Sequence, residues 1–307
     1  MATCDCGSIT LGNSGRTDCT NIANATNNLI IVPTYDESGV KNFIDTTVNL
    51  DQAWIDALIN QSDSSKRYYP LPSMKNVTSE RAEPNKQEFP DGSSIVLQQG
   101  NKSFSGEWVG KDASTTFMSK VENYGCSSIS AFIIDVDGNI IGNGSVADKL
   151  YPIALDGDTW FVNLMDAVMG TSVQMLNLTY QYDRSEEDSN LRMIAASETT
   201  PDMRNLSGLK DANAVISAPA TTGFTVTLTY DYGTQVTKQP IKGLLLADFD
   251  CNETSPTPGA EPLASVTEGA DGVYAIVYTT PVASADVLSL DLIKDGFEMT
   301  TAVITTP

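Results

Sequence analysis

The chain has 307 residues, of which 41% are hydrophobic and 19% are charged, and 39 acidic residues against 18 basic ones give it a formal net charge of −21. Such a chain can bury a core and form two domains, and it lacks an apolar run of about 18 residues, so we predict no membrane helix. The acidic balance disfavours tight nucleic-acid binding, which needs clustered Lys and Arg. Histidine, the commonest general base and zinc ligand, is absent. We therefore predict no enzymatic activity, no catalytic or metal-binding residues and no cofactor.

The first 28 residues are small and polar, and we predict an irregular N-terminal arm at 1–28. The arm has neither the basic stretch nor the apolar core of a secretory signal. It carries Cys4, Cys6 and Cys19, three of the five cysteines in the chain. These residues can bind a soft metal or form a disulfide, but their spacing fits neither a CxxC pair nor a zinc knuckle. Free thiols, made in a reducing cytoplasm, are the favoured interpretation.

Residues 29–200 are predicted to form a β-sandwich assembly domain. The apolar run NNLIIVPTY (27–35) predicts a strand that ends at a proline, and NLDQAWIDALINQ (49–61) predicts a helix with Asp51 near its start. Residues 62–94 are polar and contain four prolines. We expect a long loop there, of a kind that is often functional or wraps a neighbour.

Two strands and a short helix are predicted after this loop. The segments SSIVLQQG (93–100) and KSFSGEWVG (102–110) have alternating faces and predict strands joined by a Gly-Asn turn. The segment DASTTFMSKVENYG predicts an amphipathic helix that begins at Asp112 or Ser114 and ends in a left-handed cap at Gly125.

The segment SAFIIDVDGNIIGNGS (130–145) allows two interpretations, because Asp135, Asp137 and Asn139 alternate beside a glycine. A calcium loop that starts at Asp135 needs glycine at its sixth position and glutamate at its twelfth, but Ile and Val stand there. An apolar strand, an Asp-Gly turn and a return strand instead predict a β-hairpin. We expect its acidic tip to face water or the lumen of an assembly.

The segment LYPIALDGDTWFVNLMDAVMGTSVQMLNLTYQYD (150–183) predicts further strands. The pair Asp156-Gly157 predicts a second tight turn, and the second half alternates with a period of two. Residues 195–213 are rich in Ser, Thr, Asn and Asp. They mark a domain boundary, with a linker at 201–213.

Residues 214–307 are predicted to form a separate all-β module. Phe224, Val226 and Leu228 alternate with threonines, which predicts a strand with one buried face. Further strands follow at spacings of about ten residues, as in a β-sandwich. Tyr274 follows an Asp-Gly turn at the start of a strand, the position of a tyrosine corner whose hydroxyl bonds to upstream backbone.

This C-terminal module resembles the immunoglobulin-like domains of bacteria and phages. The segments PIKGLLLADFD, SVTEGADGVYAIVY and LIKDGFEMT carry the resemblance. It implies a domain without catalysis that decorates an extracellular or virion surface.

The first two thirds resemble the tail tube proteins of tailed bacteriophages, especially those of gut Bacteroidetes phages. The resemblance rests on SFSGEWVG, the short helix, CSSISAFIIDVDGNIIG, LYPIALDGDTWFVNL and SVQMLNLTYQYD. It implies a mainly β fold, in which a tail-tube-like β-sandwich with one or two short helices precedes an immunoglobulin-like β-sandwich. Tube subunits of this kind form stacked hexameric rings with strands that continue between subunits, which removes exposed edges.

The same resemblance implies the partners and the location of the protein. The partners are other copies of the chain and other virion proteins, with no membrane, and the protein belongs to the virion after synthesis in the host cytoplasm. DNA passes the acidic lumen only transiently, because like charges repel. Candidate residues for the lumen or for ring contacts are Asp135, Asp137, Asp156 and Asp158, with ordinary solvated turns as the alternative.

Other functions remain open at this point. The sequence does not separate a tube subunit from a head decoration, capsid or tail-ring protein of the same kind of virion, although a capsid protein usually has a longer helix than the two predicted here. A surface adhesin that binds carbohydrate can stack sugars on Trp54, Trp108 or Trp160, although the last two lie in predicted strands and fit a core better. A carboxylate hydrolase needs two acids at a set separation, and no pair among 39 acidic residues stands out.

Overall fold

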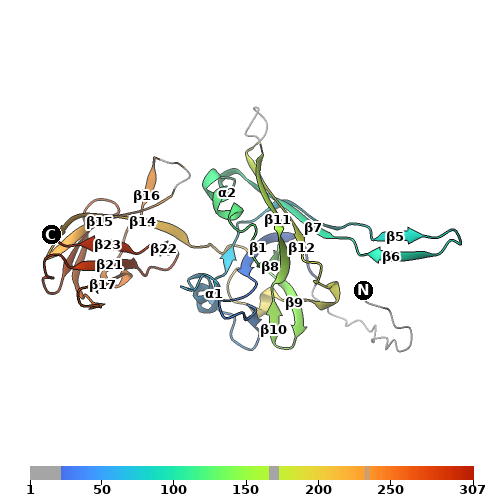
Figure 1. Cartoon of the computed structure of the whole chain (residues 1–307), viewed down its shortest axis with the longest axis horizontal. Helices are drawn as coiled ribbons and strands as arrows, with labels where there is room; N and C mark the ends of the chain where they lie inside the picture. The colour runs from blue at the N-terminus through green and yellow to red at the C-terminus, as the bar shows by residue number, and fades with distance from the viewer. Residues whose placement is uncertain (1–21, 166–172, 232–233, 235) are drawn as a thin grey trace.

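The computed structural model describes residues 22–165, 173–231, 234 and 236–307. Most of the predicted arm, with Cys4, Cys6 and Cys19, lies outside the described residues. The fold is mainly β, as predicted, with two α-helices in the described part. Its strands form two units with separate hydrophobic cores (Figure 1). Within the described ranges, no helix is both long and apolar enough to span a membrane.

The first unit is built around the strand predicted at 27–35, which is observed as β1 (Thr26–Pro33). It pairs antiparallel with β8 (Ile129–Asp135). Leu29 belongs to one core cluster and Ile30 to another, and both are buried. Burial on both faces explains why the run is continuously apolar instead of alternating.

An 11-stranded sheet forms most of this unit, and β11 joins its two halves. Residues Ile153 and Ala154 of β11 pair with β8, whereas Leu155 and the residues after it pair with β12. The sheet thereby encloses a core between β1–β8 and β7–β12. Its strand order is β2 (Ile44–Asp45), β10 (Lys149–Tyr151), β9 (Ile140–Val146), β8, β11 (Ile153–Met165), β12 (Met175–Tyr182), β7 (Lys102–Val109) and β4 (Lys75–Arg81), with β3 (Tyr69–Pro70) on β1 and β13 (Leu191–Ile194) on β9.

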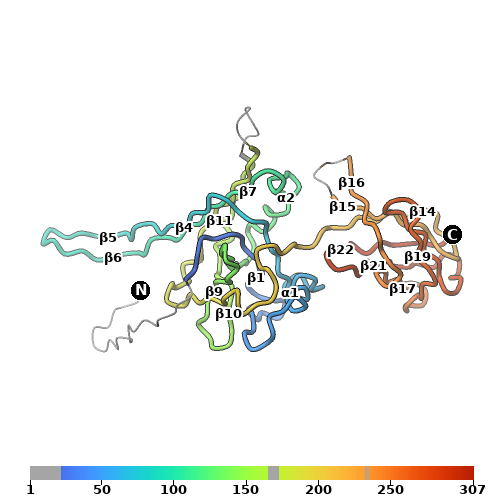
Figure 2. The backbone as a smooth tube through the Cα atoms, turned by 180° about the vertical axis from the view of Figure 1, so that it is seen from behind, coloured from blue at the N-terminus to red at the C-terminus, as the bar shows by residue number. Residues whose placement is uncertain are grey.

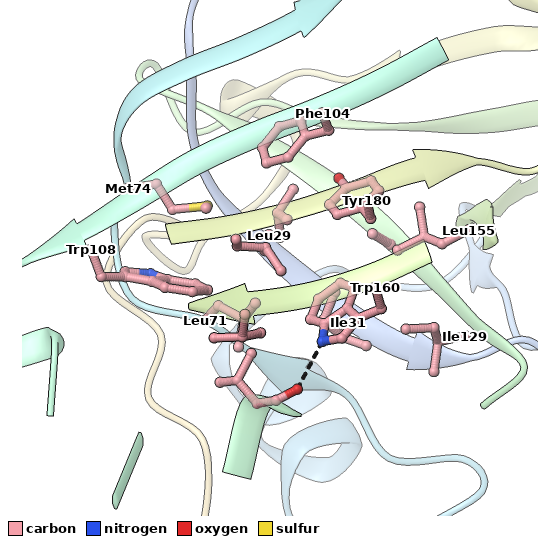
Figure 3. Close-up of a cluster of buried hydrophobic side chains, with 14 of the residues drawn as sticks. Leu29, Ile31, Leu71, Met74, Phe104, Trp108, Ile129, Leu155, Trp160 and Tyr180 are labelled. Atoms are coloured by element: carbon pink, nitrogen blue, oxygen red, sulfur yellow. Dashed lines mark hydrogen bonds between the residues drawn. The ribbon is translucent and has the colours of Figure 1, made fainter. Parts of the chain in front are cut away.

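Stacked aromatic rings fill the enclosed core (Figure 3). The Tyr180 ring lies between Phe104, at 4.8 Å between centroids, and Trp160, at 5.5 Å. The Trp160 indole nitrogen donates to the Val121 carbonyl at 2.9 Å, so this buried donor is satisfied.

Two short helices cover the sheet, close to where they were predicted. Helix α1 (Gln52–Ile59) begins at Asp51, whose side chain accepts from the Trp54 amide at 2.9 Å. Helix α2 (Thr115–Glu122) begins at Ser114, whose hydroxyl oxygen accepts from the Phe117 amide at 3.2 Å. Single turns of 3₁₀ helix are η1 (Gly110–Asp112), η2 (Asp188–Asn190), η3 (Ala196–Glu198) and η4 (Leu246–Asp248).

The predicted left-handed cap at Gly125 is wrong, because α2 ends at Glu122 and its C-cap is Asn123. The residue with positive φ is Cys126, at 59°. Its amide donates to the Gly157 carbonyl at 3.0 Å, so the turn is set by a contact with β11 as well as by the end of the helix. Cys126 is exposed, Cys251 is buried, and both are free thiols.

The loop predicted at 62–94 is wrong, since much of it is strand. It contains β3, β4 and β5 (Asn85–Glu88). Strand β6 (Ser94–Gln98) pairs with β5 and not with β7, so the hairpin predicted across Gly100 is also wrong. A β-carbon at Gly100 would collide with the Ala82 carbonyl oxygen. Glycine is needed there because the backbones of two chain segments approach closely, and not because the chain turns.

The turn predicted at Asp156-Gly157 is wrong as well. Both residues lie inside β11, at an irregularity between Asp156 and Phe161. A β-carbon at Gly157 would collide with the Ser127 carbonyl oxygen. The glycine permits a bulge and a close backbone approach, which the Asp-Gly pair alone does not distinguish from a turn.

The second unit is a β-sandwich whose two sheets share one core. The predicted alternation holds in β15, where Phe224, Val226 and Leu228 are buried. The buried Tyr274 hydroxyl donates to the Ile241 carbonyl at 2.9 Å and accepts a longer bond from the Leu244 amide. One sheet contains β19 (Leu263–Glu268), β20 (Val273–Tyr278), β15 (Gly223–Asp231), β14 (Lys210–Ala220), β22 (Phe297–Met299) and β16 (Lys238–Pro240), and the other β18 (Gly259–Ala260), β17 (Phe249–Ser255), β21 (Val287–Leu292) and β23 (Ala302–Thr305).

The connection between the units is shorter than the predicted linker at 201–213. Met203 is buried in the first unit, and Leu206 and Leu209 pack against the same core. Strand β14 begins at Lys210. Apolar side chains thus hold most of this segment on the first unit.

Candidate assembly surfaces

A two-stranded ribbon projects from the first unit (Figure 1). The ribbon comprises residues 82–101 with β5 and β6, and every residue of these two strands is exposed. Ile95 is 56% exposed, Val96 47% and Leu97 51%. An isolated two-stranded ribbon is marginally stable in water, and exposed apolar side chains that are close together, such as Ile95 and Leu97 on one face, often mark an interaction site. The ribbon is therefore a candidate contact element.

Both faces of the ribbon carry an exposed apolar side chain beside polar ones. Ile95 pairs with Gln87, and Val96 pairs with Lys86. Adjacent residues of a strand point to opposite faces, so Ile95 and Val96 lie on different faces. A partner that covers one face leaves the other apolar residue in water, so the ribbon is suited to a position between two surfaces.

A second exposed surface is the outer side of β4, β7, β12 and β11, which we name the polar sheet face. Its residues oppose one another across the strands, as Ser105 opposes Thr179. A groove of about 310 Å³ runs over part of it. Lys75 lies at its end, opposite Glu107. The polar sheet face consists of Thr78, Glu80, Ser103, Ser105, Glu107, Asn163, Asn177, Thr179 and Gln181, with the exposed Phe161, opposite Thr179, as an apolar exception.

Asp135, predicted at an acidic hairpin tip, is instead fully buried. The hairpin itself is confirmed, since Ile134 pairs with Ile140. The Asp135 carboxylate accepts from the backbone amides of Asn24, Asp137 and Asn139 and from the Asn139 side chain, at 2.7–3.0 Å. Asp135 therefore fixes the hairpin turn and the segment before β1, and its expected exposure to water or a lumen is wrong.

Burial by itself raises the pKa of Asp135, but these hydrogen bonds outweigh it and hold the pKa below the ordinary value of 3.8. A carboxyl with a depressed folded pKa stabilises the fold above its unfolded pKa, and this contribution is lost as pH falls through the folded pKa.

We expect Asp135→Asn to lower the free energy of unfolding by about 1–3 kcal/mol at neutral pH, because the amide cannot accept all four bonds. The difference from wild type should shrink as pH falls below about 4. Urea unfolding across this range, followed by tryptophan fluorescence, measures it. The exposed Asp137→Asn is the matched control, and equal effects of the two substitutions would contradict the buried role of Asp135.

The other three predicted acids are not brought together. Asp137 is exposed and accepts from the Asn24 side chain at 3.2 Å. Asp156 pairs with Gln181, so it lies at the end of the polar sheet face, and Asp158 is exposed in the β11 irregularity. Asp137 follows the end of β8, whereas Gly157 contacts Cys126, just before β8 begins. The two pairs of acids thus occupy opposite ends of β8.

A cleft of about 780 Å³ separates the first unit from the second. Tyr69, Phe117 and Tyr124 line the wall from the first unit, while Tyr230 and Lys210 line the wall from the second. The lining includes five cations, Arg67, Lys111, Lys120, Arg204 and Lys210, and four acids, Asp112, Asp211, Asp231 and Glu298. The cleft is thus slightly basic in a chain whose net charge is −21.

Polar contacts, which we name the interdomain latch, hold the two walls together. The Arg67 guanidinium donates to both oxygens of Glu298, at 2.6 and 3.0 Å, and to the Gln61 carbonyl at 2.8 Å. The Gly296 amide donates to the Asn60 side chain at 2.9 Å. Although burial lowers the pKa of Arg67, the pairing with Glu298 outweighs it and keeps the pKa above its usual value. Arg67 is only 5% exposed.

Sequence reasoning missed the ribbon, the polar sheet face and the latch. For the ribbon, the strand over 93–100 was predicted, but its partner β5 was not, because residues 85–88 are all polar. The latch joins residues 231 positions apart, and no local pattern marks such a pair.

Comparison with models of known protein families gives no match, and a search of curated proteins finds no significant relative. Within the described residues, no group of three or more Cys, Asp or Glu side chains is arranged to hold a metal ion.

Proposed function

We propose that this chain is a structural protein of a tailed-bacteriophage virion, namely the tail tube subunit, which polymerises into stacked rings. The ribbon carries this proposal. Ile95 and Val96 expose apolar surface on its opposite faces, and the ribbon has no third layer of its own. Such a ribbon becomes more stable when another copy of the chain covers its apolar side chains.

The polar sheet face supports the tube in particular. Apart from the exposed Phe161, it presents mainly hydroxyl, amide and carboxylate groups, and Lys75 at its end is the one cation that the strand pairing places there in the described residues. DNA adheres to proteins mainly through phosphate contacts with Lys and Arg. In the proposed tube this face lines the lumen, Asp156 lies at its end, and the acidic charge repels the passing DNA.

A carbohydrate-binding adhesin receives less support. Trp108 is fully buried and Trp160 is 8% exposed, so neither ring is available to stack on a sugar. Trp54 is half-buried and packs against the core cluster that contains Ile30, Ile55 and Ile59. The adhesin hypothesis relied on three indole rings that could stack on sugars, and two of these rings belong to the core.

Negative-stain electron microscopy across a concentration series tests the proposal. We expect rings or hollow tubes, with the second unit visible as knobs. Particles that stay monomeric at every concentration contradict self-assembly, and closed shells or isolated decorations would assign the chain to another part of the virion.

A shortened variant gives the matched control. Arg81 and Lys102 are directly paired at the base of the ribbon, so an Asn-Gly turn can replace residues 82–101 and close β4 onto β7. This variant should keep the thermal stability of the wild type and form no rings. If it assembles normally, the ribbon does not carry the function.

A further inference from the structure

We propose that the ribbon of one copy inserts into the interdomain cleft of the next copy. The inference rests on the proposed self-assembly and names the contact that produces it. The partner is a second copy of this chain.

The apolar side chains of the two elements are arranged in a corresponding way. The ribbon needs apolar cover on two faces, because Ile95 and Val96 point in opposite directions. The cleft offers two walls, one from each unit, with Phe117 and Tyr124 on one side and Tyr230 on the other. These three side chains are half-buried in the single chain, so a ribbon between them would cover apolar surface on both partners.

The charges also correspond. Residues 82–101 contain three acids, Glu83, Glu88 and Asp91, and one base, Lys86, so the ribbon has a net charge of 1 − 3 = −2. The cleft has one more cation than acids. Lys111 and Lys210 line it without an ion pair among the described residues, while Lys120 pairs with Asp211 at 2.7 Å. Two strongly acidic copies can therefore meet here without like-charge repulsion.

The positions of the two elements allow a chain of contacts. The ribbon projects from the side of the first unit that faces away from the second unit, as both views show (Figures 1 and 2). The cleft lies between the units. An insertion of this kind is head-to-tail, so it joins different surfaces and closes into rings or continues as a filament. The interdomain latch keeps the cleft walls at a fixed separation for the incoming ribbon.

A photo-crosslinker in the ribbon tests the contact. Benzoylphenylalanine replaces Phe89 at the ribbon tip, and labelled and unlabelled chains are mixed so that crosslinks between copies are identified by mass spectrometry. We expect crosslinks from position 89 to residues 111–124 or 204–211 of another copy. Benzoylphenylalanine in place of the exposed Tyr35 is the control and should not crosslink there. Assembled particles whose crosslinks fall elsewhere overturn the ribbon–cleft contact and leave self-assembly standing, whereas failure to assemble overturns both proposals.

Charge reversal provides an independent measurement. Lys111→Glu should raise the concentration needed for assembly about tenfold, and Glu88→Lys in the same chain should restore it. Lys41→Glu makes the same charge change at an exposed lysine of the first unit outside the cleft and should leave the assembly concentration unchanged. Equal effects of the two lysine substitutions, or no rescue, would overturn the contact.

Discussion

Replacement of Trp108 by alanine is expected to lower the free energy of unfolding of the first unit by about 3–5 kcal/mol. Trp108 is fully buried, and its ring meets Phe117 edge-on at 5.0 Å between centroids. Its indole nitrogen donates to the Pro72 carbonyl at 3.0 Å. The substitution removes this bond and leaves a cavity that the neighbouring strands cannot close.

Urea unfolding measures this effect. The chain has three tryptophans, at 54, 108 and 160, all in the first unit, so the fluorescence of the remaining two reports this unit alone. Phe161→Ala is the control. Phe161 lies on β11 of the same sheet but is 60% exposed, and its loss should change stability by about 0.5 kcal/mol or less. Similar effects of the two substitutions would contradict the assigned core.

Replacement of Glu298 by alanine is expected to release the second unit from its docked orientation. Arg67 then keeps its bond to the Gln61 carbonyl but loses its counter-charge while almost fully buried. Breaking a buried pair costs about 3–5 kcal/mol. The Glu298 side chain is 48% exposed, so we expect a smaller loss of about 1–3 kcal/mol. This loss lowers the free energy with which the two units dock, and leaves the folding free energy of each unit unchanged.

Small-angle X-ray scattering of the shortened, ribbon-free variant measures the orientation without interference from assembly. Glu298→Ala should broaden the distribution of interatomic distances, and adding Arg67→Ala should change it little further, because Arg67 has already lost its partner in the second unit. Asp271→Ala removes the carboxylate of an exposed ion pair with Lys242 inside the second unit and should have no effect. Unchanged scattering of Glu298→Ala would show that other contacts hold the units together.

The elements predicted correctly depend on neighbours in the sequence. Asp51 and Ser114 begin the two helices because a side-chain oxygen can reach an amide three residues later. The Asp-Gly turn after Asp135 and the alternation around Val226 are equally local. A short segment contains all the information that such features need.

The predictions that failed depend on distant segments. The first strand of the ribbon, β5, was taken for part of a loop, because a strand exposed on both faces need not alternate between apolar and polar residues. The second strand, β6, was predicted as a strand but with the wrong partner. Asp156-Gly157 was taken for a turn, because only the approach of Ser127 distinguishes a bulge from a turn there. Asp135 was placed at the surface, because the amide of Asn24, which helps to bury it, lies 111 residues away.

The sequence by itself determined the mainly β class, the helix starts, the acidic charge and a second unit built as a sandwich, because residue composition, short-range hydrogen bonds and side-chain periodicity specify them. Only the tertiary structure decided that residues 82–101 project as a ribbon, that the outer side of four strands is polar, and that Arg67 meets Glu298 beside a cleft. Strand partners, buried charges and clefts arise when segments far apart in the chain pack together, and the free energy of that packing is not contained in any one segment.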